Sequence, residues 1–255
     1  MPELLARKTA LILGVANKWS LAYAIAQAFH REGAQLLLTY QGERQKETVT
    51  ELGSELGAAA IFECDVTREE DLTKLAETVR QHGRLDSLVH SIAFANREDL
   101  TRPFVETSRA GYLLAQDVSA YSLVSAARTV APLMTEGGSV ITLSYLGATR
   151  VVTNYNVMGV AKAALEACVR YLSSDLGPSN IRVNAISAGP VKTASARAVA
   201  GLSKMLETMP TRAPLRRNCT PEEVADAAVF LASDLGRGVT GNVLFVDAGY
   251  QVMGF

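Results

Sequence analysis

The chain has 255 residues, and its 25 Lys and Arg residues nearly balance its 26 Asp and Glu residues, which leaves a formal net charge of −1. This balance offers no basic surface for nucleic acid or an anionic membrane, and the 48% of apolar residues excludes a disordered chain. No apolar run reaches the ~18 residues that a membrane span needs, and residues 1–7 lack the apolar core of a signal peptide. These features predict one globular domain over 1–255, located in the cytoplasm, with no membrane insertion and no nucleic-acid partner.

The three cysteines are widely spaced and odd in number, which favours free thiols in a reducing compartment over a disulfide framework. The three histidines, His90 among them, are scattered along the chain, so we expect them to be structural or on the surface. Because no cluster of His, Cys and Asp residues has the spacing of metal ligands, no metal is expected.

Short apolar runs alternate with longer segments of helical periodicity along the chain. In chain order, the predicted strands are Thr9–Leu13, Gln35–Tyr40, Ala59–Cys64, Leu85–His90, Ser139–Leu143, Ile181–Ile186 and Val243–Val246. The predicted helices between and after them are Ser20–Arg31, Glu43–Leu56, Arg68–Gln81, Ser108–Pro132, Asn154–Leu176 and Pro221–Ser233. This order predicts an α/β fold, a Rossmann-like doubly wound seven-stranded parallel sheet with helices on both faces. Two irregular stretches, Ala93–Thr107 and Ser187–Asn218, follow the carboxyl ends of strands, where ligands bind in such sheets.

The junction after the first strand has features of a phosphate-binding turn. Gly14 permits a tight turn, and Ser20 is able to cap the next helix, whose first amides then face an anion. The junction has only one of the three glycines of the usual dinucleotide fingerprint, so an ordinary capped turn explains it equally well. Asp65, after the third strand, is suited to accept a hydrogen bond from an adenine amino group or to cap the following helix. The small residues Ser91–Ala93 allow a nucleotide to lie against the backbone after the fourth strand.

Tyr155 and Lys162 are seven residues apart, about two helical turns, so both project from one face of a helix. A lysine beside a tyrosine hydroxyl favours the phenolate and lowers the pKa of the tyrosine. The pair therefore suits a proton donor or a group that stabilises a developing oxyanion. The alternative is a packed tyrosine and a solvated lysine.

The chain resembles the short-chain dehydrogenase/reductase superfamily, whose members commonly carry Tyr-x3-Lys on this helix. Here Met158 stands at that tyrosine position, and the tyrosine lies one turn earlier, which gives Tyr-x6-Lys. This spacing, the preceding Tyr145 and the Gly-x5-Ser junction resemble the enoyl-acyl-carrier-protein reductases of bacterial fatty-acid synthesis. The similarity runs essentially end to end and includes the strings HSIAFAN (90–96), SYLG (144–147), NAISAGP (184–190) and APLRR (213–217). Ala248 is a departure, because glycine or serine is more usual there.

The resemblance implies an oxidoreductase that passes a hydride from a nicotinamide to the β-carbon of a trans-2-enoyl-acyl-carrier-protein thioester, the last step of the fatty-acid elongation cycle. By the same resemblance, Tyr155 contacts the oxyanion, Lys162 binds the nicotinamide ribose and Tyr145 lines the substrate site. A phenol backed by an ammonium suits the enolate that this reaction forms. A short-chain-dehydrogenase-type carbonyl reductase is an alternative that Met158 argues against. A catalytically silent nucleotide-binding regulator is another, and the presence of both Tyr155 and Lys162 argues against it.

The resemblance also implies a full set of site residues. The cofactor-binding residues are Gly14, Ser20, Leu21, Gln41, Asp65, Val66, Ser91, Ile92, Ala93, Lys162, Ala188, Gly189, Pro190, Val191 and Thr193. The substrate-binding residues are Ala95, Tyr145, Tyr155, Met158, Leu202 and Leu206. A segment near 191–212 is expected to cover the substrate; a plain amphipathic surface helix is its alternative.

The choice of cofactor is inferred from the residues after the second strand, and the partners are inferred from the family resemblance. No basic residue directly follows the second strand, in Thr39-Tyr40-Gln41-Gly42, and this favours NADH over NADPH. Acyl carrier protein carrying enoyl chains is the implied partner. The resemblance further implies a homotetramer that uses the helices Ser108–Pro132 and Asn154–Leu176.

Overall fold

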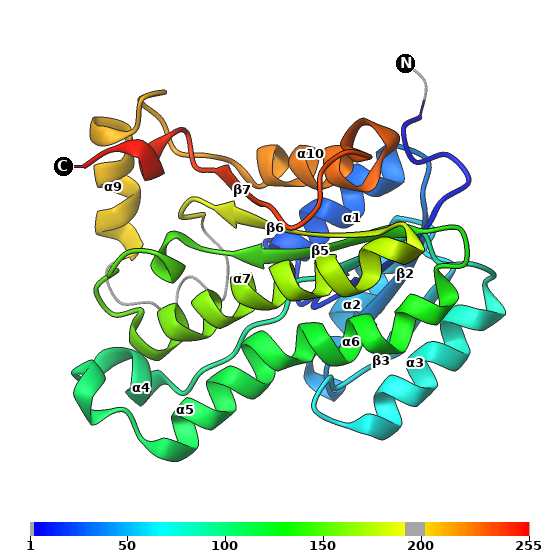
Figure 1. The fold of residues 1–255 in the computed structure, drawn as a ribbon, viewed down its shortest axis with the longest axis horizontal. Coiled ribbons are helices and arrows are strands. Elements are labelled where there is room, and N and C mark those ends of the chain that lie inside the picture. Colours follow the sequence, from blue (N-terminus) through cyan, green and yellow to red (C-terminus); the bar gives the residue numbers. More distant parts are fainter. Residues whose placement is uncertain (1–2, 192–201, 255) are drawn as a thin grey trace.

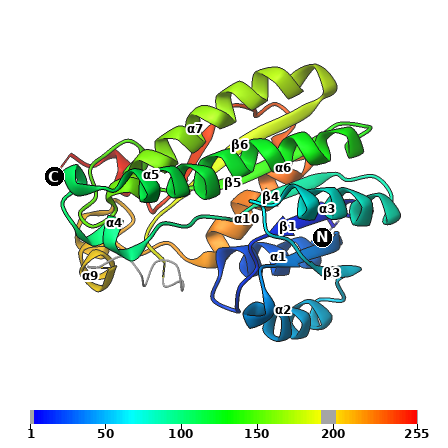
Figure 2. The same ribbon diagram turned by 90° about the horizontal axis from the view of Figure 1, so that it is seen from below.

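The computed structural model describes residues 3–191 and 202–254, which form a parallel sheet between two layers of helices (Figures 1 and 2). The sheet has seven strands in the order β3-β2-β1-β4-β5-β6-β7, and every neighbouring pair is parallel. The strands are β1 Thr9–Leu13, β2 Gln35–Tyr40, β3 Ala60–Glu63, β4 Ser87–His90, β5 Gly138–Ser144, β6 Ile181–Ala188 and β7 Val243–Val246. The predicted fold class is confirmed, and the strand order reverses between β1 and β4.

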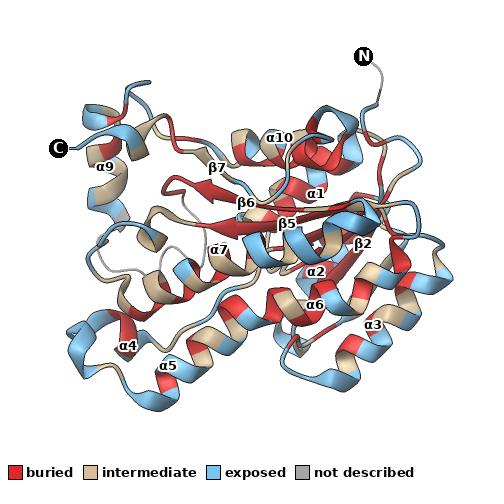
Figure 3. Cartoon of the chain, in the orientation of Figure 1, coloured by how far each residue is buried: buried red, intermediate tan, exposed pale blue. Residues whose placement is uncertain are grey.

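The helices differ in what they pack against: most bury one face against the sheet, whereas the two shortest pack on the longest helix. They are α1 Leu21–Arg31, α2 Glu43–Glu55, α3 Glu69–Gln81, α4 Arg97–Thr101, α5 Arg109–Gln116, α6 Ser122–Val130, α7 Asn156–Leu176, α9 Leu202–Arg212 and α10 Pro221–Ala232. One core lies under α1, α2 and α10, and a second lies under α3, α6 and α7 on the opposite face. The five inner strands are almost wholly buried, as a doubly wound sheet requires, whereas the edge strands β3 and β7 are only partly buried (Figure 3). No helix of the described residues is long and apolar enough to cross a membrane.

The long helix predicted over 108–132 is present as one unbroken helical segment, but its middle is π-helical and its end is 3₁₀. A π-turn over Asp117–Tyr121 separates α5 from α6, and a 3₁₀ turn over Ala131–Leu133 ends the segment. The extra residue of a π-helical turn shifts the apolar pattern by only one position, and the periodicity of a short segment does not resolve so small a shift.

Three further differences lie at the sheet's carboxyl edge. The helix predicted from Asn154 begins at Asn156, since Asn154 has a left-handed φ of 62°. The stretches predicted to be irregular contain the short helix α4 and the helix α9. Pro210 lies inside α9, and a proline at such a position argues against a helix when only the sequence is considered.

Candidate active site

A cavity of about 370 Å³ lies at the carboxyl ends of β1, β4, β5 and β6, beside the point where the strand order reverses. It is lined by these predicted residues: Gly14, Ser20, Leu21, Ser91, Ile92, Ala93, Ala95, Tyr145, Tyr155, Met158, Lys162, Ala188, Gly189, Pro190 and Val191. The structure thus brings together most of the residues predicted from scattered parts of the chain. Thr193 and the side chain of Leu202 lie outside the described residues.

The turn between β1 and α1 depends on its glycine and its serine. Gly14 has a φ of +92°, and a Cβ atom there would lie 2.2 Å from the carbonyl oxygen of Ser91. Only glycine therefore lets the turn pack against the end of β4. The Ser20 hydroxyl accepts a hydrogen bond from the Tyr23 amide at 3.2 Å and caps α1. Because Ser20 and Leu21 line the cavity, the positive end of α1 opens onto it.

Gln41, Asp65 and Val66 are not among the residues that line this cavity. The Gln41 side-chain amide donates to Asp65 Oδ2 at 3.1 Å, so these two side chains do meet. Asp65 Oδ1 accepts from both the amide and the hydroxyl of Thr67, so it shapes the turn before α3 and does not cap that helix. Burial raises the pKa of Asp65, but the bonds from Thr67 and Gln41 outweigh it, and the pKa is lowered overall. Val66 is buried in the core under α3.

Tyr145, Tyr155 and Lys162 all line the first cavity. Tyr155 lies directly before α7, and Lys162 follows on that helix. The rings of Tyr145 and Tyr155 pack edge to face, with centroids 5.0 Å apart and planes at 68°. Lys162 is only 5% exposed, and its Nζ donates to the carbonyl oxygen of Leu143 at 2.8 Å. A side chain at Gly147 would collide with the Tyr155 ring, so this glycine admits the ring.

The predicted lowering of the Tyr155 pKa is wrong. Burial raises the pKa of Tyr155 far above its ordinary value, and Tyr145 raises it further. Burial also raises the pKa of Tyr145 to about 12. The same desolvation lowers the pKa of Lys162 to about 8, because its ammonium, bonded to Leu143, has lost most of its water. At neutral pH, Tyr155 is therefore a protonated phenol that can donate a hydrogen bond.

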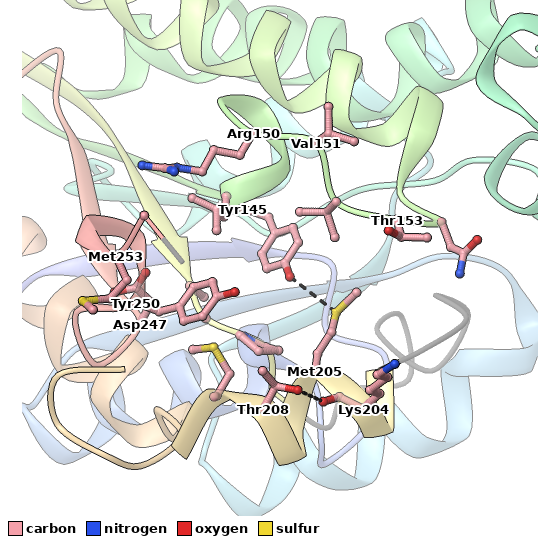
Figure 4. A pocket seen from close by; sticks show the side chains of 18 residues that line it. Tyr145, Arg150, Val151, Thr153, Lys204, Met205, Thr208, Asp247, Tyr250 and Met253 are labelled. Atoms are coloured by element: carbon pink, nitrogen blue, oxygen red, sulfur yellow. Dashed lines mark hydrogen bonds between the residues drawn. The ribbon is translucent and has the colours of Figure 1, made fainter. Parts of the chain in front are cut away.

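A second cavity, of about 510 Å³, lies on the far side of Tyr145 (Figure 4). The Tyr145 hydroxyl donates to Met205 Sδ at 3.7 Å, and both side chains line the two cavities. Arg150 and Lys204 contribute cations to this second cavity, and Tyr250 comes to it from the C-terminal segment.

Two residues that the sequence analysis did not predict as site residues, Phe94 and Leu100, line the first cavity. Within the segment predicted to cover the substrate, Met205 lines both cavities, whereas Leu206 lines neither. The backbone carbonyl of Leu206 instead accepts a hydrogen bond from Asn218. The rotation of α9 decides which of two neighbouring apolar residues faces the site, and composition carries no signal of it. In the described part of the chain, no three His, Cys, Asp or Glu side chains are grouped to hold a metal ion, and the cysteines are free thiols.

A seven-stranded parallel sheet, a capped turn at its switch point, and Tyr155 and Lys162 lining one cavity define a Rossmann-type reductase of the short-chain dehydrogenase/reductase class. Within that class, the family model described as "Enoyl-(Acyl carrier protein) reductase" matches residues 14–251. The chain belongs to the enoyl-acyl-carrier-protein reductase family.

Individual relatives agree with this assignment. The chain is 54% identical over 255 residues to the Bacillus cereus enoyl-[acyl-carrier-protein] reductase [NADH] FabI, an alignment covering 99% of this chain and 100% of the relative. It is 48% identical over 252 residues to the Staphylococcus aureus enzyme, which is named as [NADPH], with 98% of each chain covered. The crystal structure of the Bacillus cereus enzyme with NADP+ and indole naphthyridinone matches with a TM-score of 0.98 and 53% identity, covering 100% of both chains.

Proposed function

We propose that the 370 Å³ cavity is the active site of this enoyl-acyl-carrier-protein reductase, and that Tyr145, Tyr155 and Lys162 are its catalytic residues. The enzyme reduces the carbon–carbon double bond of trans-2-enoyl-acyl-carrier-protein thioesters in fatty-acid synthesis. The convergence of these three side chains with the positive end of α1 in one cavity carries the proposal. The whole of 1–255 acts as one catalytic domain.

The residues of the cavity fit a nicotinamide dinucleotide. The N-terminus of α1, at Ser20 and Leu21, suits the pyrophosphate, and the buried ammonium of Lys162 suits ribose hydroxyls. Ser91–Ala93 and Ala188–Val191 offer backbone and small side chains along the rest of the cavity. Gln41, Asp65 and Val66 would then meet the adenosine end. When bound, the nicotinamide supplies the hydride.

The chain's own residues stabilise the charge that the reaction develops on the thioester carbonyl. Because Tyr155 keeps its proton, its hydroxyl donates to this oxygen as it becomes an enolate. The Lys162 ammonium adds a positive field in a site from which water is largely excluded, where electrostatic interactions are stronger. Tyr145 orients Tyr155 through the edge-to-face ring contact and lines the substrate side.

The acyl chain lies against the apolar side of the cavity. Ala95 and Met158 line that side, together with Met205 from α9. The cavity beyond Tyr145 and Met205 provides further room, and the segment 191–212 covers the substrate. Residues 192–201 of this segment lie outside the described residues.

NADH is the proposed electron donor. No basic residue directly follows β2: Gln41 stands there, its amide donates to the Asp65 carboxylate, and Lys46 further along pairs with Glu43 at 3.0 Å, which supports NADH. The names of the relatives are mixed, with NADH for Bacillus cereus and NADPH for Staphylococcus aureus. Comparing kcat/KM for the two nicotinamides at fixed crotonyl thioester tests this assignment, and a higher value for NADPH would reverse it.

Acyl carrier protein, a homotetramer and a cytoplasmic location complete the proposal. Apolar side chains lie exposed on α5, the π-turn and α7, namely Leu113, Tyr121 and Tyr171, and a subunit interface would cover them. The free thiols of the described cysteines suit a reducing compartment.

The decisive assay follows nicotinamide absorbance with two thioesters. We expect oxidation of NADH with crotonyl thioester, whose double bond is conjugated to the carbonyl. Oxidation only with acetoacetyl thioester would favour the carbonyl-reductase alternative. Binding of NADH without turnover of either thioester would favour the regulator.

A further inference from the structure

Glu166 is a buried carboxylate on α7, one helical turn beyond Lys162. It is 6% exposed, and Lys162 is 5% exposed. Residues four apart on a helix lie on the same face, so the two side chains are neighbours in the same buried region. A carboxylate loses much hydration free energy on burial unless other groups bond or pair with it. Its position beneath the active site therefore needs a physical reason.

Glu166 is bonded to Ser144, which directly precedes Tyr145 in the chain. The Ser144 hydroxyl donates to Glu166 Oε1 at 2.5 Å, a length typical of a charge-assisted bond to a carboxylate. Lys162 Nζ donates to the carbonyl oxygen of the preceding residue, Leu143, at 2.8 Å. Two consecutive residues at the end of β5 are thus bound to α7 at points one turn apart, and the next residue in the chain is Tyr145.

Glu166 also affects the pKa of Lys162 through its charge. Burial lowers the pKa of Lys162 to about 8, and the charge of Glu166 opposes this shift. His90, from β4, faces Lys162 but is neutral, because burial lowers its pKa to about 3. Tyr155, directly before α7, and Tyr145, after β5, are also neutral near pH 7. Burial raises the pKa of Glu166, and the bond from Ser144, Arg170 one turn further along α7, and Lys162 all oppose this rise and favour the charged carboxylate.

We propose that Glu166 is a positioning residue of the active site, whose carboxylate keeps the Lys162 ammonium charged and fixes, through Ser144, the strand end that presents Tyr145. This inference rests on the proposed roles of Lys162 and Tyr145. It adds a residue that touches neither substrate nor cofactor and acts through two residues that do.

The charge effect is tested with Glu166→Gln, which keeps an oxygen for Ser144 but removes the charge. NADH binding is titrated by nicotinamide fluorescence from pH 6 to 10 without acyl substrate, so the readout does not depend on turnover. In the wild type, we expect affinity to fall as Lys162 loses its proton near pH 8. We expect the midpoint of this fall to move about one pH unit lower in Glu166→Gln, roughly a tenfold weaker hold on the proton.

Asp175→Asn is the matched control for charge. It removes the same charge from an exposed position at the far end of α7, about 20 Å from Lys162 along the helix. Its midpoint should equal that of the wild type. An unchanged midpoint in folded Glu166→Gln, or an equal shift in Asp175→Asn, overturns the charge effect.

The positioning effect is tested with Ser144→Ala, which keeps the carboxylate and removes the bond to it. We expect kcat with crotonyl thioester to fall about tenfold, while NADH affinity stays near the wild-type value. Ser139→Ala is the control, because Ser139 lies on the same strand and donates an equally buried bond, to Leu231 at 2.9 Å. Thermal unfolding of both variants measures the structural cost.

Each outcome bears on one part of the proposal. Wild-type kcat in Ser144→Ala, or an equal loss in Ser139→Ala, overturns the positioning effect. If Glu166→Gln does not fold, the two serine variants decide the inference. If the wild type binds NADH but reduces no enoyl thioester, the proposed function fails, whereas the binding titration still tests Glu166.

Discussion

At the scale of single residues, the proposed roles of Tyr155 and Lys162 differ: Tyr155 serves turnover and Lys162 serves cofactor binding. Tyr155→Phe removes the donor to the oxyanion, so we expect kcat to fall about 10²-fold with little change in NADH affinity. Lys162→Ala removes the ammonium beside the proposed ribose site, so we expect mainly weaker NADH binding. Steady-state kinetics with crotonyl thioester and fluorescence titration of NADH measure the two effects. Unchanged kinetics in both variants would contradict the assigned roles.

Ala248, the departure from the family noted above, has a φ of 58°. An L-residue in this left-handed conformation costs about 1–2 kcal/mol, which glycine avoids at the expense of some chain entropy. We expect Ala248→Gly to raise the free energy of unfolding by about 0.5–1 kcal/mol, measured by urea denaturation. Ala227→Gly, inside α10, should lower it by a similar amount. A loss of stability in Ala248→Gly would show that packing of the methyl group outweighs the backbone strain.

At the scale of elements, the π-turn between α5 and α6 bonds to a residue that lines the first cavity. It directs the hydroxyl of Ser119 to the backbone of Phe94, donating to its carbonyl at 3.0 Å and accepting from its amide at 2.9 Å. Phe94 in turn lines the first cavity. The two residues are 25 positions apart, so no local pattern in the sequence predicts that they meet.

His90 joins three elements through its buried ring. Nδ1 lies 3.0 Å from the Thr142 hydroxyl on β5, and Nε2 lies 2.8 Å from the Ser122 hydroxyl on α6. Burial, followed by the charge of Lys162, lowers the pKa of His90 from 6.5 to about 3. Between these two values the unfolded chain binds more protons than the folded one, so acidification removes stability in this window.

We therefore expect the free energy of unfolding to fall between pH 6.5 and about 3, with a contribution from His90 of at most about 1.4 kcal/mol per pH unit. Urea denaturation at several pH values measures the slope, and His90→Gln should reduce it even if that variant is less stable overall. His30→Gln, at an exposed position on α1, serves as the control. Equal slopes in the wild type and His90→Gln would contradict the prediction.

At the scale of the whole molecule, the exposed apolar face of α5, the π-turn and α7 predicts an assembly. Four chains of 27.3 kDa would give a particle of about 109 kDa in analytical ultracentrifugation. We expect Leu113→Glu combined with Tyr121→Glu to yield smaller species, because each would place a charge in the interface. Glu77→Gln, on the exposed face of α3, should leave the mass unchanged. A wild-type monomer at micromolar concentration would refute the tetramer.

The class of fold, and the residues that line the first cavity, could largely be predicted from local patterns along the chain. Strand and helix signals are local, so β1, β2 and β7 occur at the predicted residues, and the alternation of elements specified a parallel sheet. Since parallel strands end at one edge, the residues after them met in one cavity as predicted. The sequence also predicts that Tyr155 and Lys162 lie on the same side of the chain, because a helix repeats every 3.6 residues.

Only the tertiary structure decided how these residues act. Desolvation keeps Tyr155 protonated and makes Lys162 easier to deprotonate, and desolvation depends on everything packed around a side chain. Whether Met205 or Leu206 lines the first cavity depends on how α9 is rotated about its own axis. The bond between Ser144 and Glu166 joins residues 22 positions apart. These properties arise from contacts through space, which a pattern along the chain does not contain.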